Sequence, residues 1–492
     1  MSEYPFSELF DGLHAELRGA PVAAVTGLSF DSRRCAPGTV FFALHGTHED
    51  GARYAADAVQ KGASVVVSQQ ALPELGEVCN VVVPDVAEAL GTLASRFYGD
   101  PSQKLKLVGV TGTNGKTTVV TLLHELMGLL GCKSGLLSTI ENRVLDQVHP
   151  TTMTTPDPIT VNALLREMVD AGCQYAFMEV SSHAAAQHRV AGLNFAGGVF
   201  TNITRDHLDY HKTFADYLSA KQSFFTGLPA EAFALVNIDD DHAAQMTQNA
   251  HCHVHTYSLQ EMADYHAKVR AVTLGAMDLE VDGREVTVVL LGRFNAYNLL
   301  AVYAVGQQLG FSQEVLLPGL SQLHPVRGRF DCQLGPNGLV VVVDYAHTPD
   351  ALEKVYETIE EIKPLRGHII TVMGCGGNRD QEKRADMGKI AAQHSQWLFV
   401  TNDNPRNEDP EQIANMVLKG IGRESLPQVF VELDRAKAIR QACLLAASGD
   451  YVLVAGKGHE TYQEVQGQRT HFDDREEVFK AIEELKSEET AQ

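Results

Sequence analysis

The chain has 492 residues, of which 44% are hydrophobic and 21% are charged, and its formal net charge is −22. This composition excludes wholesale disorder, and the length predicts about three domains. The negative charge repels phosphate backbones, so it disfavours a protein that coats nucleic acid. An anionic ligand would therefore require cations that gather at its own site.

The eight cysteines are scattered, and none of them form a C-x-x-C pair. This usage predicts reduced thiols in a cytoplasmic protein. The sequence begins MSEYPFSELFDGL, with an early acidic residue and no apolar run, so we expect no signal peptide. No apolar stretch approaches the roughly 18 residues of a membrane-spanning helix, so we expect no membrane contact.

Short apolar runs and helical patterns alternate in the first part of the chain. Val65–Val67 and Val81–Val83 predict buried strands, and Asp85–Phe97 predicts a helix. The segment Tyr98–Lys104 gathers Gly, Asp, Pro and Ser, which is typical of a linker. We therefore expect a first domain at 1–103.

A strand, a glycine-rich loop and a helix follow one another in the next part. Leu105–Val110 is mostly apolar, and Thr111–Thr118 reads TGTNGKTT before a helical pattern. Ala176–Val180 and Ala234–Ile238 are further strand candidates that polar residues follow, as at the carboxyl edge of a parallel sheet. The segment HPVRGRFD then predicts the end of a central domain at 104–330.

From Leu339 onwards, apolar runs and helical patterns alternate regularly. Helices are expected to begin near Pro349, Pro410 and Asp434. This alternation predicts a doubly wound, Rossmann-like parallel sheet with right-handed crossovers in a domain at 331–492. Polar clusters end several of its strands, and such clusters converge at one edge of the sheet.

The loop TGTNGKTT predicts phosphate binding. Glycines let a backbone wrap closely around phosphates, and the N–H groups of the following helix point at them. Lys116 would reach the outer phosphates, and the Thr117 hydroxyl would hold Mg²⁺. A standard P-loop has glycine where this chain has Val110, so the loop is a variant. A tight turn without a ligand is the alternative. The residues expected to contact phosphate are Gly112, Thr113, Asn114, Gly115, Lys116, Thr117 and Thr118.

This loop resembles the ATP loop of the Mur ligase family, whose members couple ATP hydrolysis to forming an amide bond on a cell-wall precursor. Ligases that add glutamate to folates have a similar loop, so the loop alone indicates the superfamily. Further motifs resemble the family in order and spacing between Asp31 and Asp474. They are DSR at Asp31, EVSSH at Glu179, DHLDYH at Asp206, YLSAK at Tyr217, FNAYN at Phe294 and DNPR at Asp403. The resemblance implies three α/β domains with a central P-loop ATPase-type sheet.

The resemblance implies a magnesium site of Thr117, Glu179, His207 and Lys221, with Lys221 carbamylated and with Lys116 beside it as a catalytic residue. Carbamylation requires a neutral amine, which burial favours. Each residue also has an ordinary interpretation. Glu179 could be a solvated cap, and Lys221 could reach water. His207 and His211 would share one face of a helix, as metal ligands can. Their segment could equally be a helix N-terminus at which acidic side chains act as caps.

The resemblance also implies the nucleotide and substrate contacts. Asn298 would contact adenine, although an N-cap is as good an interpretation. Arg329 would contact ATP, and Asp344 would contact its ribose. The implied contacts to the UDP-sugar-peptide substrate are Ser32, Thr154, Thr155, Ser181, Gln187 and Arg189. Ala184 and Ala185 replace a Gly and a Leu of the family pattern.

The segment DNPR resembles the sequence that is characteristic of family members that add meso-diaminopimelate. Diaminopimelate differs from lysine by one carboxylate, which the planar guanidinium of Arg406 could bind bidentately. Taken alone, the segment is a turn before a helix that begins at Pro410. The implied acceptor site is Arg379, Asp403, Asn404, Pro405, Arg406, Gly456 and Glu460. Asn378 and Ala385 stand where the family pattern has Asp and Pro.

The resemblance thus implies an ATP-dependent amide ligase that adds meso-2,6-diaminopimelate to UDP-N-acetylmuramoyl-L-alanyl-D-glutamate through an acyl phosphate, in peptidoglycan precursor synthesis. It would use ATP with Mg²⁺, and we expect a monomer. Two alternatives remain open. The same ligase could use L-lysine or another diamino acid, or the chain could be a P-loop NTPase or kinase that forms no amide.

His251, His253 and His255 would share one face of a strand, as metal ligands can. Partner ligands at a usual spacing are missing from the sequence around them, and the family has no site there. We therefore expect an exposed strand and assign these histidines no role.

Overall fold

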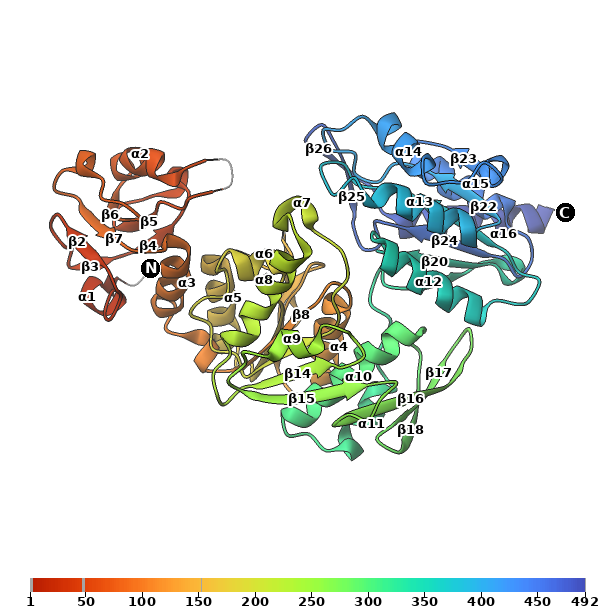
Figure 1. Ribbon diagram of the computed structural model, residues 1–492, viewed down its shortest axis with the longest axis horizontal. Coiled ribbons are helices and arrows are strands. Elements are labelled where there is room, and N and C mark those ends of the chain that lie inside the picture. The colour runs from red at the N-terminus through yellow and green to blue at the C-terminus, as the bar shows by residue number, and fades with distance from the viewer. Residues whose placement is uncertain (1–2, 47–48, 152, 492) are drawn as a thin grey trace.

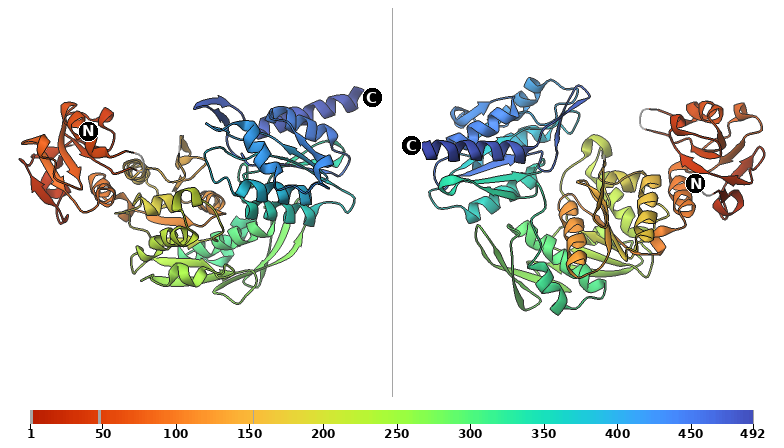
Figure 2. Two further views of the ribbon diagram at one scale, coloured as in Figure 1. Left: turned by 45° about the horizontal axis from the view of Figure 1, so that its top comes forward. Right: turned by 180° about the vertical axis from the view of Figure 1, so that it is seen from behind.

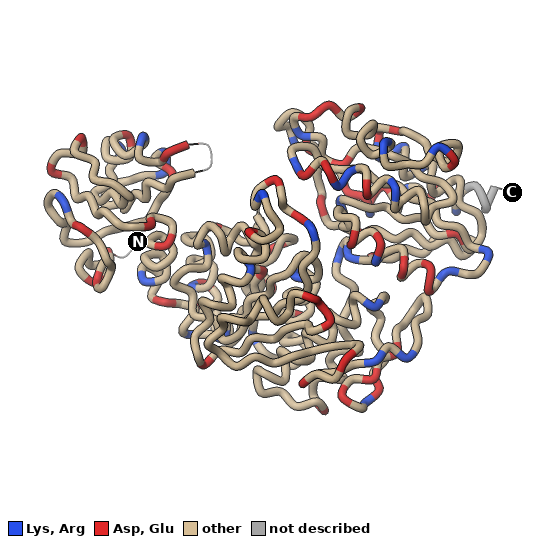
Figure 3. The backbone as a smooth tube through the Cα atoms, in the orientation of Figure 1, with Lys and Arg blue, Asp and Glu red and all other residues tan. Residues whose placement is uncertain are grey.

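Three layered α/β units follow one another in chain order across the computed structural model, which describes residues 3–46, 49–151 and 153–491 (Figure 1). The central unit lies between the two others and contacts both, as the view from behind also shows (Figure 2). Lys, Arg, Asp and Glu are scattered over all three units (Figure 3). The net charge therefore does not come from a single acidic region.

The N-terminal unit is a five-stranded sheet in the order β2-β7-β6-β5-β4, in which only β2 pairs antiparallel. The strands are β2 (Glu16–Arg18), β4 (Gly27–Ser29), β5 (Thr39–Phe42), β6 (Ala63–Ser68) and β7 (Cys79–Val82), with a separate pair of β1 (Tyr4–Pro5) and β3 (Ala24–Val25). The helices are α1 (Phe6–Leu9), α2 (Ala55–Gln60) and α3 (Val86–Phe97). Asp85 caps α3 by accepting from two backbone N–H groups. The two predicted strands and the predicted helix are confirmed.

The central unit is an eleven-stranded sheet in the order β11-β10-β9-β12-β8-β13-β14-β15-β16-β17-β18. The strands from β9 to β16 in this order run parallel, and the two edges are antiparallel. Their bounds are β8 (Lys106–Thr111), β9 (Ser134–Leu137), β10 (Asn142–Val144), β11 (Gln147–His149), β12 (Tyr175–Glu179), β13 (Gly197–Phe200), β14 (Phe233–Asn237), β15 (His253–Ser258), β16 (Tyr265–Val272), β17 (Met277–Val281) and β18 (Arg284–Val288). The antiparallel extension β16–β18 was not among the predicted elements.

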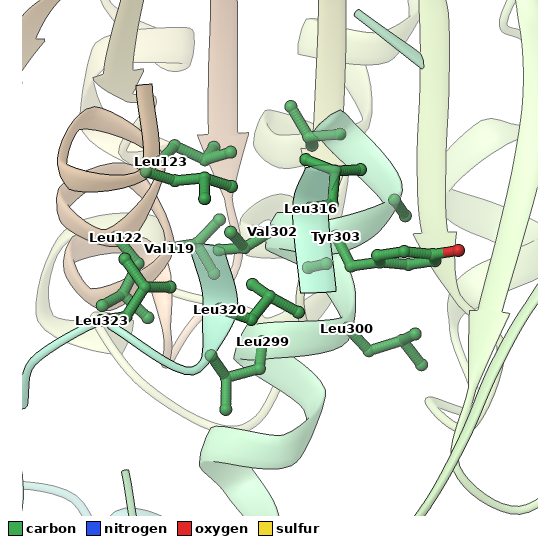
Figure 4. Packing of buried hydrophobic residues seen from close by; sticks show 14 of the residues in the cluster. Val119, Leu122, Leu123, Leu299, Leu300, Val302, Tyr303, Leu316, Leu320 and Leu323 are labelled. Carbon is green, nitrogen blue, oxygen red and sulfur yellow. The ribbon is translucent and has the colours of Figure 1, made fainter. Parts of the chain in front are cut away.

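Helices cover both faces of the central sheet, because successive strand residues point to opposite sides. One face carries α4 (Lys116–Leu129), α10 (Arg293–Gln308) and α11 (Gln313–Leu320), whose leucines and valines interlock (Figure 4). The other face carries α5 (Pro158–Asp170), α6 (Ser182–Ala186), α8 (Phe214–Thr226) and α9 (Ala243–Thr247). The short α7 (Leu208–His211) projects toward the C-terminal unit (Figure 1).

The C-terminal unit is a six-stranded sheet in the order β19-β20-β24-β21-β22-β23, parallel except for β19. Its strands are β19 (Asp331–Leu334), β20 (Val340–Asp344), β21 (Ile369–Met373), β22 (Trp397–Val400), β23 (Val429–Val431) and β24 (Tyr451–Ala455), and β25 (Tyr462–Val465) with β26 (Gln468–His471) forms a hairpin. One face carries α12 (Pro349–Ile362), α13 (Lys383–His394) and α14 (Pro410–Leu418). The other face carries α15 (Arg435–Leu445) and α16 (Asp474–Ala491). This is the expected doubly wound arrangement.

Three helices begin with the same local chemistry, a capping side chain followed by proline. Asp157, Thr348 and Asp409 each accept a hydrogen bond from a backbone N–H of the first turn of α5, α12 and α14. The following proline lacks an N–H group that would have no partner there. The predicted helix starts at Pro349 and Pro410 are confirmed, and Asp434 caps α15.

The predicted domain limits fall between elements of the structure. Residue 103 ends a short 3₁₀ helix, Pro101–Gln103, before β8, and residue 330 directly precedes β19. The limits themselves stay predictions. Among the described residues, the helices are too short or too polar to cross a membrane.

Candidate active site

The glycine-rich loop joins β8 to α4 at the carboxyl edge of the central sheet. Gly112 and Gly115 have φ angles of 151° and 89°, which glycine adopts without strain. A Cβ at Gly112 would overlap the Thr201 Oγ1 atom, and one at Gly115 would lie 2.5 Å from Asn298 Oδ1. Both glycines are therefore required by the backbone and by the close approach of the neighbouring strand and helix.

Two lysine amines meet at this loop. Lys116 Nζ donates to the carbonyl oxygens of Gly112 at 2.8 Å and Thr113 at 2.9 Å. Lys221, on α8, donates to the same Gly112 oxygen at 2.7 Å and is 1% exposed. Burial, and then the nearby Lys116 ammonium, lower the pKa of Lys221 well below its ordinary value. An anion at the loop would favour the charged form of both amines.

Glu179 ends β12 behind the loop and is 1% exposed. Its Oε1 accepts from the Thr139 N–H at 2.7 Å, whereas Oε2 is buried and has no hydrogen-bond partner among the described residues. A buried carboxylate oxygen without a partner suits a hard cation such as Mg²⁺. The interpretation of Glu179 as a solvated cap does not hold.

His207 precedes α7 with a φ of 54°, and only His211 lies within the helix. The two histidines therefore do not share a helical face, and the segment is a helix N-terminus. Burial lowers the pKa of His207, so its imidazole is neutral and offers a lone pair. In the part of the chain that the structure describes, no group of three or more His, Cys, Asp or Glu side chains could hold a metal ion. A magnesium ion here would need phosphate, water or carbamate oxygens as well.

Contacts between units surround the phosphate loop. The Arg329 guanidinium donates to Thr117 Oγ1 at 3.2 Å and lies 4.4 Å from the centre of the Tyr345 ring. Asn114 Nδ2 donates to Asp350 Oδ2, in α12, at 3.1 Å. The loop of the central unit is thus linked to the C-terminal unit, as a site for ATP between them requires.

Two predicted nucleotide residues have structural partners. Asp344 accepts from the backbone N–H groups of Phe330 at 2.6 Å and Ala346 at 2.7 Å, and burial raises its pKa to about 6. Asn298 is buried in α10 and donates to Asn295 Oδ1 at 3.0 Å. It lies inside the helix and is not an N-cap. Their contacts to ribose and adenine stay predictions.

A cleft of about 760 Å³ separates the central and C-terminal units. Predicted site residues line both of its walls: Thr154, Thr155, Ser181, Arg189 and His207 on one side, and Arg379, Asp403, Asn404, Arg406, Gly456 and Glu460 on the other. Lys116, Glu179 and Lys221 lie outside this lining, at the phosphate loop. Ser32 lies in the N-terminal unit, in the 3₁₀ helix Ser32–Arg34. The structure therefore brings the predicted substrate and acceptor residues together, with Ser32 apart from them.

Hydrogen bonds among the residues predicted to bind the UDP-peptide fix the wall of the cleft that they line. Thr155 Oγ1 donates to the Glu179 carbonyl oxygen at 2.8 Å and accepts from the Ser181 N–H at 3.1 Å. Arg189 donates to the Thr155 carbonyl oxygen at 2.7 Å and to Gln187 Oε1 at 2.6 Å. Ser181 Oγ caps α6 by accepting a hydrogen bond from the Ala184 N–H. Ala184 lies inside α6, where alanine favours the helix, so the structure accommodates alanine in place of the glycine of the family pattern.

On the acceptor wall, Arg406 has a φ of 52°, and its NH1 group donates to the Gly377 carbonyl oxygen at 2.7 Å. Asn378 also has a φ of 52°, and its Oδ1 accepts from the Asn407 N–H at 3.1 Å. Asparagine tolerates this left-handed backbone better than most residues. The structure thus accommodates Asn378, where the family pattern has Asp. Its side chain also joins the loop that carries Arg379 to the loop that carries Arg406.

A group of polar and charged side chains that was not predicted from the sequence crosses the cleft. Asp206 Oδ1 lies 3.7 Å from Lys383 Nζ, and Asp206 Oδ2 lies 3.9 Å from His347 Nε2. Arg205 also contacts Glu382. Asp206 belongs to the segment DHLDYH, from which only the histidines were considered as metal ligands. A search for polar residues after each strand would have found Asp206 and His347.

Family models match most of the chain. Residues 24–98 match the model for the Mur ligase family catalytic domain, residues 110–306 that for the Mur ligase middle domain, and residues 328–458 that for the Mur ligase glutamate ligase domain. The matches follow the three units in order.

Similar proteins cover nearly the whole chain. A protein of Cytophaga hutchinsonii is 53% identical over 454 residues, which are 92% of this chain and 93% of that protein. One of Phocaeicola vulgatus is 51% identical over 463 residues, 94% of this chain and 96% of that protein. Both are named UDP-N-acetylmuramoyl-L-alanyl-D-glutamate–2,6-diaminopimelate ligase. A solved structure with the same name is 33% identical, has a TM-score of 0.68 and covers 98% of this chain and 99% of its own. With three family models matched in order and relatives more than 50% identical along nearly its full length, the chain belongs to the Mur ligase family.

Proposed function

We propose that the chain is an ATP-dependent amide ligase that adds meso-2,6-diaminopimelate to UDP-N-acetylmuramoyl-L-alanyl-D-glutamate, in peptidoglycan precursor synthesis. The observation that carries the proposal is the cleft. Residues expected to bind the UDP-peptide line one of its walls, and residues expected to bind the diamino acid line the opposite wall. The names of the relatives support the same reaction. A plain NTPase or kinase has no need for an acceptor wall of this kind.

The first step makes an acyl phosphate. The γ-phosphoryl group of ATP passes to the γ-carboxylate of the D-glutamate residue, and ADP is released. Lys116 and the N–H groups of the phosphate loop stabilise the charge that spreads over the transferring oxygens. Arg329 reaches the same place from the domain boundary, where it already donates to Thr117.

We propose Thr117, Glu179 and His207 as the residues that hold Mg²⁺, which supplies charge neutralisation and Lewis acidity to phosphoryl transfer. The buried, unpartnered Glu179 Oε2 supports this proposal. Lys221 would contribute as a carbamate, which forms when its neutral amine adds to CO₂ and loses a proton. The lowered pKa of Lys221 favours that neutral amine.

The second step forms the amide bond. The amine of diaminopimelate attacks the acyl carbon, the C–O bond to phosphate breaks, and the amine loses a proton. The Arg406 guanidinium would take the carboxylate that lysine lacks, and Arg379 stands beside it on the cleft wall. Because both walls belong to one chain, we propose that the monomer is the active unit. We place it in the cytoplasm, where ATP and UDP-activated precursors are available.

The test is phosphate release and tripeptide formation with ATP, Mg²⁺ and UDP-N-acetylmuramoyl-L-alanyl-D-glutamate, with meso-diaminopimelate or L-lysine added separately. The proposal expects both products with diaminopimelate only. Equal turnover with lysine would keep the ligase but reject the role of Arg406. Phosphate release that ignores both amines would favour an NTPase instead.

A further inference from the structure

Lys457 is a buried cation directly behind the acceptor wall. It lies between β24 and the hairpin β25–β26, and it is 0% exposed. Its neighbours Asn404 and Glu460 line the cleft, whereas Lys457 does not. A fully buried ammonium is costly unless it is paired and hydrogen-bonded, so its partners indicate what it does.

The three side chains close a triangle of hydrogen bonds. Lys457 Nζ donates to Glu460 Oε2 at 3.0 Å and to Asn404 Oδ1 at 3.2 Å. Asn404 Nδ2 donates to the same Glu460 Oε2 at 2.7 Å. The Glu464 N–H also donates to Asn404 Oδ1, at 2.9 Å. Each residue of the triangle therefore fixes the orientation of the other two.

These contacts determine which atoms remain for a ligand. Two donors on Asn404 Oδ1 leave only one orientation of the amide, with Nδ2 toward Glu460. One oxygen of Glu460, Oε2, is used inside the triangle. Within the described residues, its Oε1 has no hydrogen-bond partner, so it can accept from a ligand in the cleft.

The same triangle bears on the charge of Glu460. Burial and the nearby Asp403 carboxylate both raise the pKa of Glu460, and the Lys457 ammonium opposes them. A carboxylate accepts a hydrogen bond from an ammonium group best when it is ionised. Removing Lys457 would leave Asp403 and Glu460 as neighbouring acids without the ammonium that pairs directly with Glu460, because the buried Arg435 guanidinium pairs with Asp474 instead.

We propose that Lys457 is a positioning residue for the acceptor amino acid. It holds Asn404 and Glu460 in the arrangement that receives an ammonium group of the acceptor, and it touches neither the acceptor nor the reacting atoms. The inference rests on the proposed function, because the acceptor wall has this use only in an amide ligase.

The test compares Lys457→Met, which keeps the length of the side chain, with Lys457→Arg, which keeps its charge. The KM for meso-diaminopimelate should rise roughly tenfold or more in Lys457→Met, as when one partner of a buried charge pair is removed. The KM for ATP and for the UDP-peptide should stay within about twofold. The Arg variant should recover part of the loss. Lys480→Met is the matched control, because Lys480 pairs with Glu477 on the surface.

A pH profile separates positioning from a general structural role. Without the Lys457 ammonium, Glu460 protonates at higher pH, so the acid limb of kcat/KM for diaminopimelate should move to higher pH. A merely structural role would lower kcat and the unfolding temperature and leave that limb in place. The second result would overturn the proposal.

A double variant covers the case in which Lys457→Met does not fold. Lys457→Met with Glu460→Gln removes both charges of the pair, so it avoids an unpaired buried acid. Its KM for diaminopimelate should lie within about threefold of Glu460→Gln alone, since Glu460 is the charged partner of Lys457 and Asn404 keeps the Glu464 N–H as a donor. A further tenfold rise would overturn the proposal. If the unchanged protein forms no tripeptide, the proposed function fails and this inference falls with it; if it does and Lys457→Met is unaltered, only the inference fails.

Discussion

Arg406 is the residue on which the choice of acceptor depends in the proposed reaction. Its guanidinium is held by Gly377 before any ligand arrives. Arg406→Met should raise the KM for meso-diaminopimelate roughly a hundredfold, because a buried ion pair with the second carboxylate is lost. Steady-state kinetics with each substrate varied in turn would measure this.

Arg284→Met is the control for that substitution, since Arg284 pairs with Glu314 on the surface. Its KM values should match those of the unchanged protein. A KM for diaminopimelate that Arg406→Met leaves unchanged would contradict the assignment of Arg406 to the second carboxylate.

Lys116 is the second residue with a sharp expectation. Its amine lies at the loop, where it donates to the Gly112 and Thr113 carbonyl oxygens, and this is where the phosphates are proposed to bind. Lys116→Ala should lower kcat by roughly three orders of magnitude, which is the scale for losing a cation at a transferring phosphoryl group. Lys389→Ala, at an exposed position of α13, is the control. Turnover near normal in Lys116→Ala would reject the loop as the ATP site.

At the scale of elements, one glycine of the loop and one of α4 differ in what their positions require. Gly112 has a positive φ and close neighbours, whereas Gly128 lies in α4 with open space around it. Gly112→Ala should lower kcat roughly a hundredfold, because the loop must shift away from Thr201. Gly128→Ala should stabilise the protein by about 0.5–1 kcal/mol, since alanine favours helix. Kinetics and urea denaturation of both variants would check this, and equal effects would contradict it.

The packing of α4 against β9 predicts that the stability of the fold depends on pH. His124 of α4 shares a hydrogen bond with Ser134 of β9 at 2.8 Å, and burial lowers its pKa to about 4. The unfolded chain therefore takes up this proton first as the pH falls from about 6.5 toward 4, and stability is lost in that window. The free energy of unfolding should fall between pH 7.5 and pH 5, and His124→Gln should reduce this fall by at most about 2 kcal/mol, as measured by urea denaturation at the two pH values. His14→Gln, at an exposed position, should leave it unchanged.

The regular elements were predictable where their signals are local. The cap and proline pairs before α12 and α14 and the apolar strands between them depend on few neighbouring residues. The antiparallel strands β17 and β18 do alternate apolar and polar residues, as in Met277–Val281, so their own pattern would have predicted them. Helix α13 escaped prediction because most of its residues are polar and its apolar face is decided by the rest of the fold. His253 and His255 lie in a strand, β15, as expected, but His251 precedes it, so the three histidines do not share one strand face. His253 is exposed and His255 is half-buried.

For the whole molecule, the N-terminal unit is fitted closely against the central one. A Cβ at Gly91, in α3, would lie 2.7 Å from the Ala191 carbonyl oxygen of the central unit. Gly91→Ala should therefore displace the unit that carries Ser32 from the rest of the substrate site. The KM for the UDP-peptide should rise roughly tenfold, and that for ATP should stay unchanged.

Gly275→Ala is the control, because Gly275 has open space around it. Limited proteolysis of the segment Tyr98–Lys104 should be faster in Gly91→Ala than in the control. Equal rises in the KM of both substrates would instead indicate general destabilisation.

The site was predictable one motif at a time, but its arrangement was not. Glu179 and Lys221 came from a resemblance, and their burial became visible only in the folded chain. The pairing of Asp206 with Lys383 joins residues far apart in sequence across two units. Lys457 was missed for the same reason, since its proposed role depends on Asn404, which reaches it from the loop after β22.

The left-handed backbone at Arg406 would make the evolution of the proposed acceptor specificity asymmetric. A side chain other than glycine or asparagine costs about 1 kcal/mol in such a conformation. A lineage that replaced Arg406 by glycine or asparagine would lose the guanidinium with its bond to Gly377 and would relieve the backbone strain in the same step. The reverse step would have to regain the cation against that strain. Selection can therefore abandon a second carboxylate on the acceptor more easily than it can return to one.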